Sequence, residues 1–123
     1  MATIAPAYDY TKGDDTVVVT WAAVTQADTF GPAGGGRFTD YADRCVQIYG
    51  TFGAATIVVN GSNVADASNM LPLTDPQGNA ISKTTAAIEA ITENALFIQP
   101  THSGGAGESI NVVLIARRMR TGK

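Results

Sequence analysis

The chain contains a single histidine, His102, and this residue has the most specific chemistry that the sequence offers. Ser103 follows it directly, so a serine hydrolase would have its general base and its nucleophile as neighbours. Adjacent side chains of an extended segment point to opposite faces, and no nucleophile-elbow sequence surrounds either residue. We therefore expect a solvated loop histidine between Pro100 and a glycine-rich segment, and no hydrolytic triad.

The single cysteine, Cys45, excludes an intrachain disulfide framework and a multi-cysteine zinc site. Its only nearby cation, Arg44, should leave the strand on the opposite face. We expect Cys45 to be a small buried hydrophobe and not a reactive thiol.

Glycine-rich segments and paired carboxylates suggest other sites, which their surroundings do not support. Residues 34–36 and 104–107 lack the Gly-Lys-Ser/Thr sequence and the following helix that a phosphate loop needs. The aspartates do not have the spacing of a calcium loop, and we interpret them as turn and edge residues. The sequence thus predicts no catalytic, metal-binding or cofactor-binding residue, no cofactor and no enzyme activity.

Aromatic side chains give an alternative, because exposed rings can form a platform for a sugar. Trp21 ends an apolar segment and Phe97 lies inside another, which favours core positions for both. A carbohydrate-binding β-sandwich module, from a phage tail or an accessory lectin domain, stays open as a second hypothesis. Its candidate residues are Trp21, Tyr41, Tyr49, Phe52 and Phe97.

Short alternating or β-branched segments must position these residues. Such segments predict strands at 16–21, 44–49, 54–59, 96–99 and 109–116. The last of these has apolar residues on both faces, which indicates a central or covered strand. Residues 84–94 can be interpreted as a helix or as a strand with a turn, and their Ile, Thr and Asn content favours the strand. Turn formers such as Asn60-Gly61 separate the segments.

This pattern predicts an all-β, antiparallel sandwich of one domain over residues 14–118, with an N-terminal arm at 1–13 and a basic C-terminal tail at 119–123. The length of 123 residues suits one core. Charged residues make up only 15% of the chain, and the net charge is −3. A broad basic surface for nucleic acid is therefore excluded. No apolar run is long enough to span a membrane, and we expect no secretory signal at the start.

A set of short phrases runs along the chain in a fixed order: Val-Thr-Trp at 19–21, residues 41–56, 59–63, 73–80 and 98–100, the Gly104-Gly105 loop, and 112–118. With these phrases the region from Trp21 to Arg118, about four-fifths of the chain, resembles the small capsid cement or decoration proteins of tailed bacteriophages. The sequence departs from that family at Val64-Ala65-Asp66, where the family often has Asp-Gly and then an aromatic residue.

The resemblance implies a jelly-roll-like sandwich on the outside of a phage head, made in the host cytoplasm. There it would bridge subunits of the major capsid protein as a dimer or trimer and stabilise the shell. A head-completion or tail-tube subunit is a further alternative. The two termini would supply the contacts, the first through aromatic side chains and the second through cations. The expected partner-binding residues are Tyr8, Tyr10, Arg117, Arg118, Arg120 and Lys123.

Overall fold

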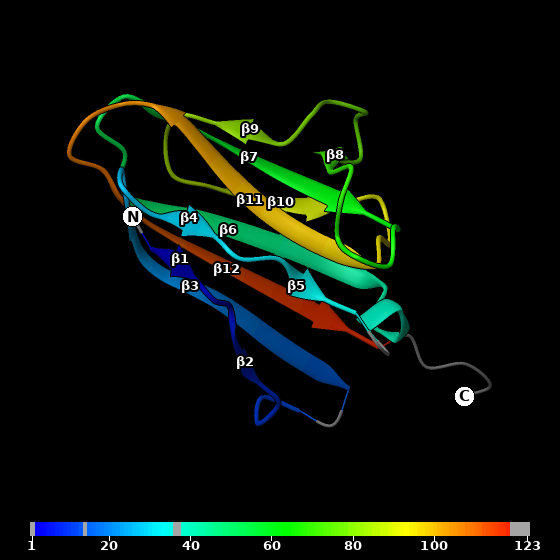
Figure 1. Cartoon of the computed structure of the whole chain (residues 1–123). Helices are drawn as coiled ribbons and strands as arrows, with labels where there is room; N and C mark the ends of the chain where they lie inside the picture. Colours follow the sequence, from blue (N-terminus) through cyan, green and yellow to red (C-terminus); the bar gives the residue numbers. More distant parts are fainter. Residues whose placement is uncertain (1, 14, 36–37, 119–123) are drawn as a thin grey trace.

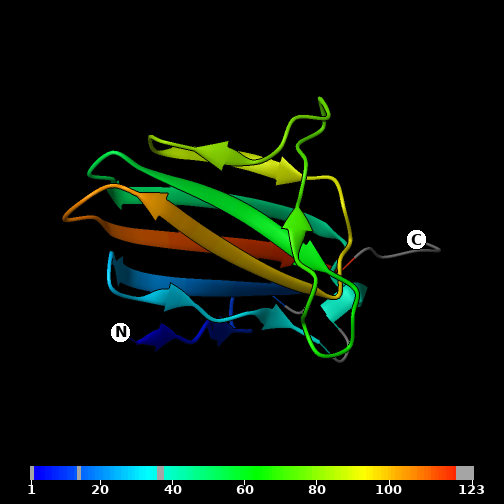
Figure 2. The same cartoon turned by 45° about the horizontal axis from the view of Figure 1, so that its top comes forward.

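The computed structural model describes residues 2–13, 15–35 and 38–118, which form two packed β-sheets (Figure 1). We call them sheet I, with the strand order β10-β6-β12-β3-β2, and sheet II, with the order β5-β11-β7-β8 and β9 paired to β7. Figure 2 shows the sheets as two layers. The expected all-β, antiparallel sandwich is confirmed.

Sheet I is built from the longest strands and sheet II from two long strands with short partners. Sheet I contains β2 (Ala7–Asp9), β3 (Thr16–Thr25), β6 (Asp43–Thr51), β10 (Ala87–Ile91) and β12 (Ser109–Arg117). Sheet II contains β5 (Ala33–Gly34), β7 (Ala55–Ser62), β8 (Leu71–Pro72), β9 (Ser82–Lys83) and β11 (Phe97–Gly104). The remaining elements are β1 (Thr3–Ile4), β4 (Thr29–Phe30) and a 3-10 turn, η1 (Phe38–Asp40).

Strand β12 lies in the middle of sheet I, between β3 and β6. Its residues alternate, so that Ile110, Val112 and Leu114 are buried between the sheets. Val113 and Ile115 point to the opposite face and are half-buried. The central strand predicted from two apolar faces is therefore confirmed.

The core lies between the sheets and is dominated by β-branched residues, because alternate positions of each strand face inward. Trp21 is fully buried and donates its indole N–H to the carbonyl oxygen of Gly31 at 2.8 Å. Its ring meets that of Phe30 edge-on at 6.3 Å. The core position expected for Trp21 is thus confirmed.

The segment at 84–94 contains a strand and not a helix. Residues 87–91 form β10, which pairs antiparallel with β6, with Ile88 opposite Gln47. The pairing satisfies the backbone groups of β6 that face β10, and it confirms the preference for a strand.

The expected N-terminal arm needs correction. Part of it forms β-structure, since β2 pairs antiparallel with β3 at the edge of sheet I and β1 pairs parallel with β4 in a separate two-stranded sheet. These backbone hydrogen bonds make residues 3–4 and 7–9 edge strands of the domain, so they need no partner to order them. The tail expected at 119–123 lies outside the described residues.

Candidate subunit-docking surface

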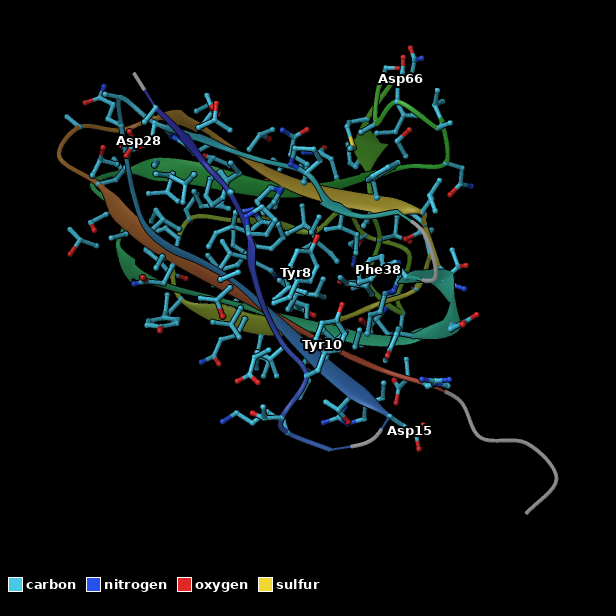
Figure 3. All side chains as sticks on the ribbon, turned by 60° about the horizontal axis from the view of Figure 1, so that its bottom comes forward. Tyr8, Tyr10, Asp15, Asp28, Phe38 and Asp66 are labelled. Carbon is cyan, nitrogen blue, oxygen red and sulfur yellow. The ribbon has the colours of Figure 1, made fainter. Side chains whose placement is uncertain are left out.

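The short edge strand β2 and the residue that follows it place two expected partner-binding residues, Tyr8 and Tyr10, on one face. Tyr8 lies opposite Val19, so both tyrosines belong to the inward face of sheet I, at its open edge. Their rings are nearly parallel, with an interplanar angle of 8° and centroids 6.5 Å apart. Tyr8 is 43% exposed and Tyr10 is 60% exposed. Figure 3 shows the two rings beside each other.

Tyr8 is fixed from sheet II by the backbone of β5. The N–H of Gly34 donates to the hydroxyl oxygen of Tyr8 at 3.0 Å. Gly34 has a φ of +124°, and a Cβ there would lie 2.2 Å from the carbonyl oxygen of Leu96. Only glycine allows this approach, so the residue type at position 34 helps to set the position of the tyrosine pair.

A buried arginine, Arg44, holds the turn that forms the next part of the surface. Its guanidinium donates to the carbonyl oxygens of Tyr41 at 2.8 Å, Ala95 at 2.7 Å and Phe38 at 3.0 Å. It also lies 4.1 Å from the centroid of the Phe38 ring. Burial lowers the pKa of Arg44 to about 10, so the side chain stays protonated at neutral pH. Arg44 thereby ties η1 and the segment before β11 to sheet I.

Arg118 completes this side of the molecule. Its guanidinium carbon lies 5.3 Å from the centroid of the Tyr41 ring, and its Nε lies 3.5 Å from Oδ1 of Asp15. Tyr8, Tyr10, Phe38 and Tyr41 surround a hollow of about 330 Å³. We call Tyr8, Tyr10, Phe38, Tyr41 and Arg118 the docking surface.

The structure thus brings together three of the six expected partner-binding residues, namely Tyr8, Tyr10 and Arg118. Arg117 lies elsewhere, because it is the last residue of β12 and points to the outer face of sheet I beside Asp43 of β6. Arg120 and Lys123 lie outside the described residues.

The sequence analysis missed Arg44 and Phe38 as parts of this site. A buried cation in a strand resembles any other basic residue in the sequence. The available signal was its position, since Arg44 lies two residues before Val46 and four before Ile48 and so shares their inward face.

Two other expectations for single residues change. His102 is not a solvated loop residue, because it lies in β11 with its side chain only 10% exposed. Its partner is the buried Glu108, and its ring contacts Phe30 edge-on at 5.7 Å. Cys45 is half-buried on the outer face of sheet I and not in the core. Burial raises the pKa of this thiol, which agrees with an unreactive cysteine.

The aromatic residues proposed for a sugar platform are not gathered in one place. Tyr41 borders the docking surface, whereas Tyr49 lies on β6 and points to the opposite face of sheet I. Within residues 2–13, 15–35 and 38–118, no group of His, Cys, Asp and Glu side chains could hold a metal ion. The same part of the chain has no helix long and apolar enough to cross a membrane.

Another hollow, of about 680 Å³, lies away from the docking surface. It is bordered by β8 and by the segments at 61–64 and 93–95, and the exposed Leu71 lies at its rim. Among the described residues, no expected partner-binding residue lines it.

The fold is shared with a prophage-derived protein. The solved structure of the SPBc2 prophage-derived protein YomS superposes with a TM-score of 0.56 and 13% identity, over 83% of this chain and 93% of that chain. NMB1881 from Neisseria meningitidis has a TM-score of 0.37 at 11% identity, covering 91% of this chain and 82% of that one. A subunit of Bacillus endospore appendages, described as disulfide-linked pili, has a TM-score of 0.38 at 16% identity, with 94% and 90% covered.

No family model matches the sequence, and no curated protein matches it. The likeness to YomS concerns the fold, since the identity is low.

Proposed function

We propose that this chain is a structural subunit of a phage-derived particle and that it binds a neighbouring protein through the docking surface. The observation that carries the proposal is the parallel, exposed pair of Tyr8 and Tyr10, held in place by Gly34. Tyrosine and arginine are enriched among the residues that dominate protein interfaces. A pre-ordered aromatic pair also loses little conformational freedom on binding.

The more specific proposal is a cement or decoration protein on the capsid exterior, with the major capsid protein as its partner. Two observations support it: the resemblance of residues 21–118 to that family, and the fold shared with a prophage-derived protein. A sandwich whose described residues form no evident reactive centre suits a part whose role is contact. We therefore propose no enzymatic activity for it.

The first experiment counts copies. Particles produced from the genome that encodes the chain are purified, and the chain is quantified by mass spectrometry relative to the major capsid protein. Hundreds of copies per particle support a cement role, whereas a dozen or fewer indicate a head-completion or tail subunit. Particles that contain none of the chain overturn the proposal.

A second experiment tests the surface itself. Tyr10→Ala removes an exposed ring, and Leu71→Ala is the matched control, because Leu71 is 69% exposed on the remote strand β8. Particles lacking the chain are mixed with each purified variant. We expect Tyr10→Ala to reduce incorporation at least tenfold and Leu71→Ala to leave it unchanged. Equal incorporation of both would exclude Tyr10 from the contact.

The tyrosine pair also favours the alternative, a carbohydrate-binding module, because two parallel rings can contact successive sugar rings. A glycan array separates the two functions. Binding that disappears in Tyr10→Ala and persists in Leu71→Ala would support the carbohydrate module over the cement protein.

A further inference from the structure

The outer face of sheet I carries an apolar surface opposite the core. Register places Val18, Ile115 and Cys45 in one row across β3, β12 and β6. The next row runs through Val113 and Gln47 to Ile88. We call these six residues the outer face. They surround a shallow hollow of about 330 Å³ together with Arg117.

This face is uncovered by the described part of the chain, since sheet II packs against the other side of sheet I (Figures 1 and 2). Ile88 at its margin is 64% exposed, and Gln47 is its most polar member. Its charges lie at its margins, where Asp43 and Arg117 stand opposite each other on β6 and β12 and Asp9 of β2 lies beside Val18. An apolar patch with charges confined to its rim is typical of a protein interface.

The dimensions of the face suit another sheet. Four strands spaced about 4.8 Å apart, each contributing about six residues at 3.3 Å, give about 400 Å² per copy in projection. The flat projected areas of two copies add up to about 800 Å². Tyr49 and β2 extend this buried area toward the roughly 1,000 Å² that a specific interface needs.

We propose that the outer face packs against the same face of a second copy, related by a two-fold axis that runs along the strands between β6 and β12. In this arrangement β6 of one copy faces β12 of the other, and β10 faces β3. Asp43 of each copy then meets Arg117 of the other, so the interface contains two symmetry-related pairs of opposite charges. Aligned packing of two sheets about 10 Å apart is an ordinary arrangement.

The charge pattern makes this proposal self-complementary, and it favours a second copy over an unrelated partner. An axis running through β12 instead would place Asp43 opposite Thr16 and leave the charges unmatched. The second copy is one of the partners in the proposed function. Only the use of the dimer in a particle rests on that function.

The experiment is sedimentation velocity on the purified full chain at about 100 µM. We expect the molar mass obtained for wild type to be twice the 12.7 kDa of one chain. Ile88→Lys, at an exposed position that folding tolerates, should raise the dimer dissociation constant at least tenfold. Leu71→Lys, equally exposed and on β8, should leave it unchanged.

Charge exchange tests the axis. Asp43→Arg alone places like charges opposite each other in a homodimer, as does Arg117→Asp alone. A mixture of the two variants restores both opposite-charge pairs in a heterodimer, so we expect it to dimerise more tightly than either variant by itself. A mixture that behaves as the average of the two overturns the axis.

A monomeric wild type overturns the dimer, as does a dimer that is insensitive to Ile88→Lys. If the chain is monomeric and Ile88→Lys instead prevents incorporation into particles, another protein covers this face. The sedimentation experiment contains no particles, so its outcome does not depend on docking through Tyr10. A failure of the dimer and a failure of the docking surface are therefore distinguishable.

Discussion

His102 Nδ1 lies 2.7 Å from Oε2 of Glu108, and this contact joins β11 to the segment just before β12. The other ring nitrogen, Nε2, lies 2.6 Å from the carbonyl oxygen of Asp28. Since a carbonyl oxygen only accepts, Nε2 carries a proton and donates it. His102 therefore links sheet II to the loop before β4 and to the start of β12, the central strand of sheet I.

The first prediction concerns the stability that this link provides. His102→Ala leaves the buried Glu108 without its partner, and we expect the free energy of unfolding to fall by about 3 kcal/mol. Glu108→Gln keeps the shape and can donate an amide N–H to Nδ1, so its loss should be about 1 kcal/mol. Urea denaturation measures both. Equal losses would contradict this expectation, because they would mean that an amide at position 108 cannot replace the carboxylate as the partner of His102.

The second prediction concerns acid. The hydroxyl of Thr25, 2.8 Å from Asp28 Oδ2, and the Thr25 N–H, 3.1 Å from the same oxygen, hold the pKa of Asp28 below its usual 3.8. The folded state thus binds the proton less tightly than the unfolded chain. The resulting stability is present above the unfolded pKa and is lost as the pH falls through the folded pKa.

Unfolding of wild type and Thr25→Val is compared between pH 6 and pH 2.5. We expect the stability difference between the two to shrink toward the acid end. An NMR titration of the Asp28 carboxyl should show its pKa rising in Thr25→Val. A difference that stays constant across this range would contradict the assignment.

The third prediction concerns Arg44. Arg44→Lys retains the charge but cannot reach three separate carbonyl oxygens, so buried acceptors are left without donors. We expect a loss of about 2–3 kcal/mol in the free energy of unfolding. Arg118→Lys is the control, since Arg118 is exposed, and it should change stability by less than about 0.5 kcal/mol.

Arg44→Lys should also loosen the turn that carries Phe38 and Tyr41. Hydrogen exchange of the Tyr41 amide, which donates to the Phe38 carbonyl oxygen at 3.0 Å, measures this directly. Unchanged protection at Tyr41 would mean that the turn is held by other contacts.

The fourth prediction concerns Gly34. In Gly34→Ala the new Cβ would meet the carbonyl oxygen of Leu96 and the ring of Phe38. Since both the φ and the space favour glycine, we expect β5 to shift and stability to fall by about 2–4 kcal/mol. Thermal unfolding checks the loss. Gly78→Ala is the control, because its φ of +85° is strained while its surroundings are open.

The sequence predicted most of the long strands but not which of them pair. The alternation of residues 44–49 and the double apolar pattern of 109–116 carry the period of a strand, and both segments are strands of sheet I. Which strands neighbour each other is a long-range property that local periodicity does not contain. The short edge strand β2 was missed for the same reason, since only its pairing with β3 makes it a strand.

Some residues of interest could likewise be predicted from the sequence and others could not. Tyr8 and Tyr10 stood out because aromatic residues are unexpected in a patternless segment. His102 was misjudged because its partners, Glu108 and the carbonyl group of Asp28, come from the following turn and from a distant loop. A solvated and a buried histidine have the same local sequence when the burying residues are remote.

The position of β12 between β3 and β6 has a consequence for biosynthesis. The middle strand of sheet I is the last described strand to leave the ribosome. Until then the edges of β3 and β6 that pair with it have no partner strand. Closing that gap joins residues about ninety positions apart, and such distant pairing is slow. A nascent chain cut short before residue 109 lacks the connection between the two halves of this layer. Incomplete translation products should therefore be cleared as unfolded chains and not built into an assembly.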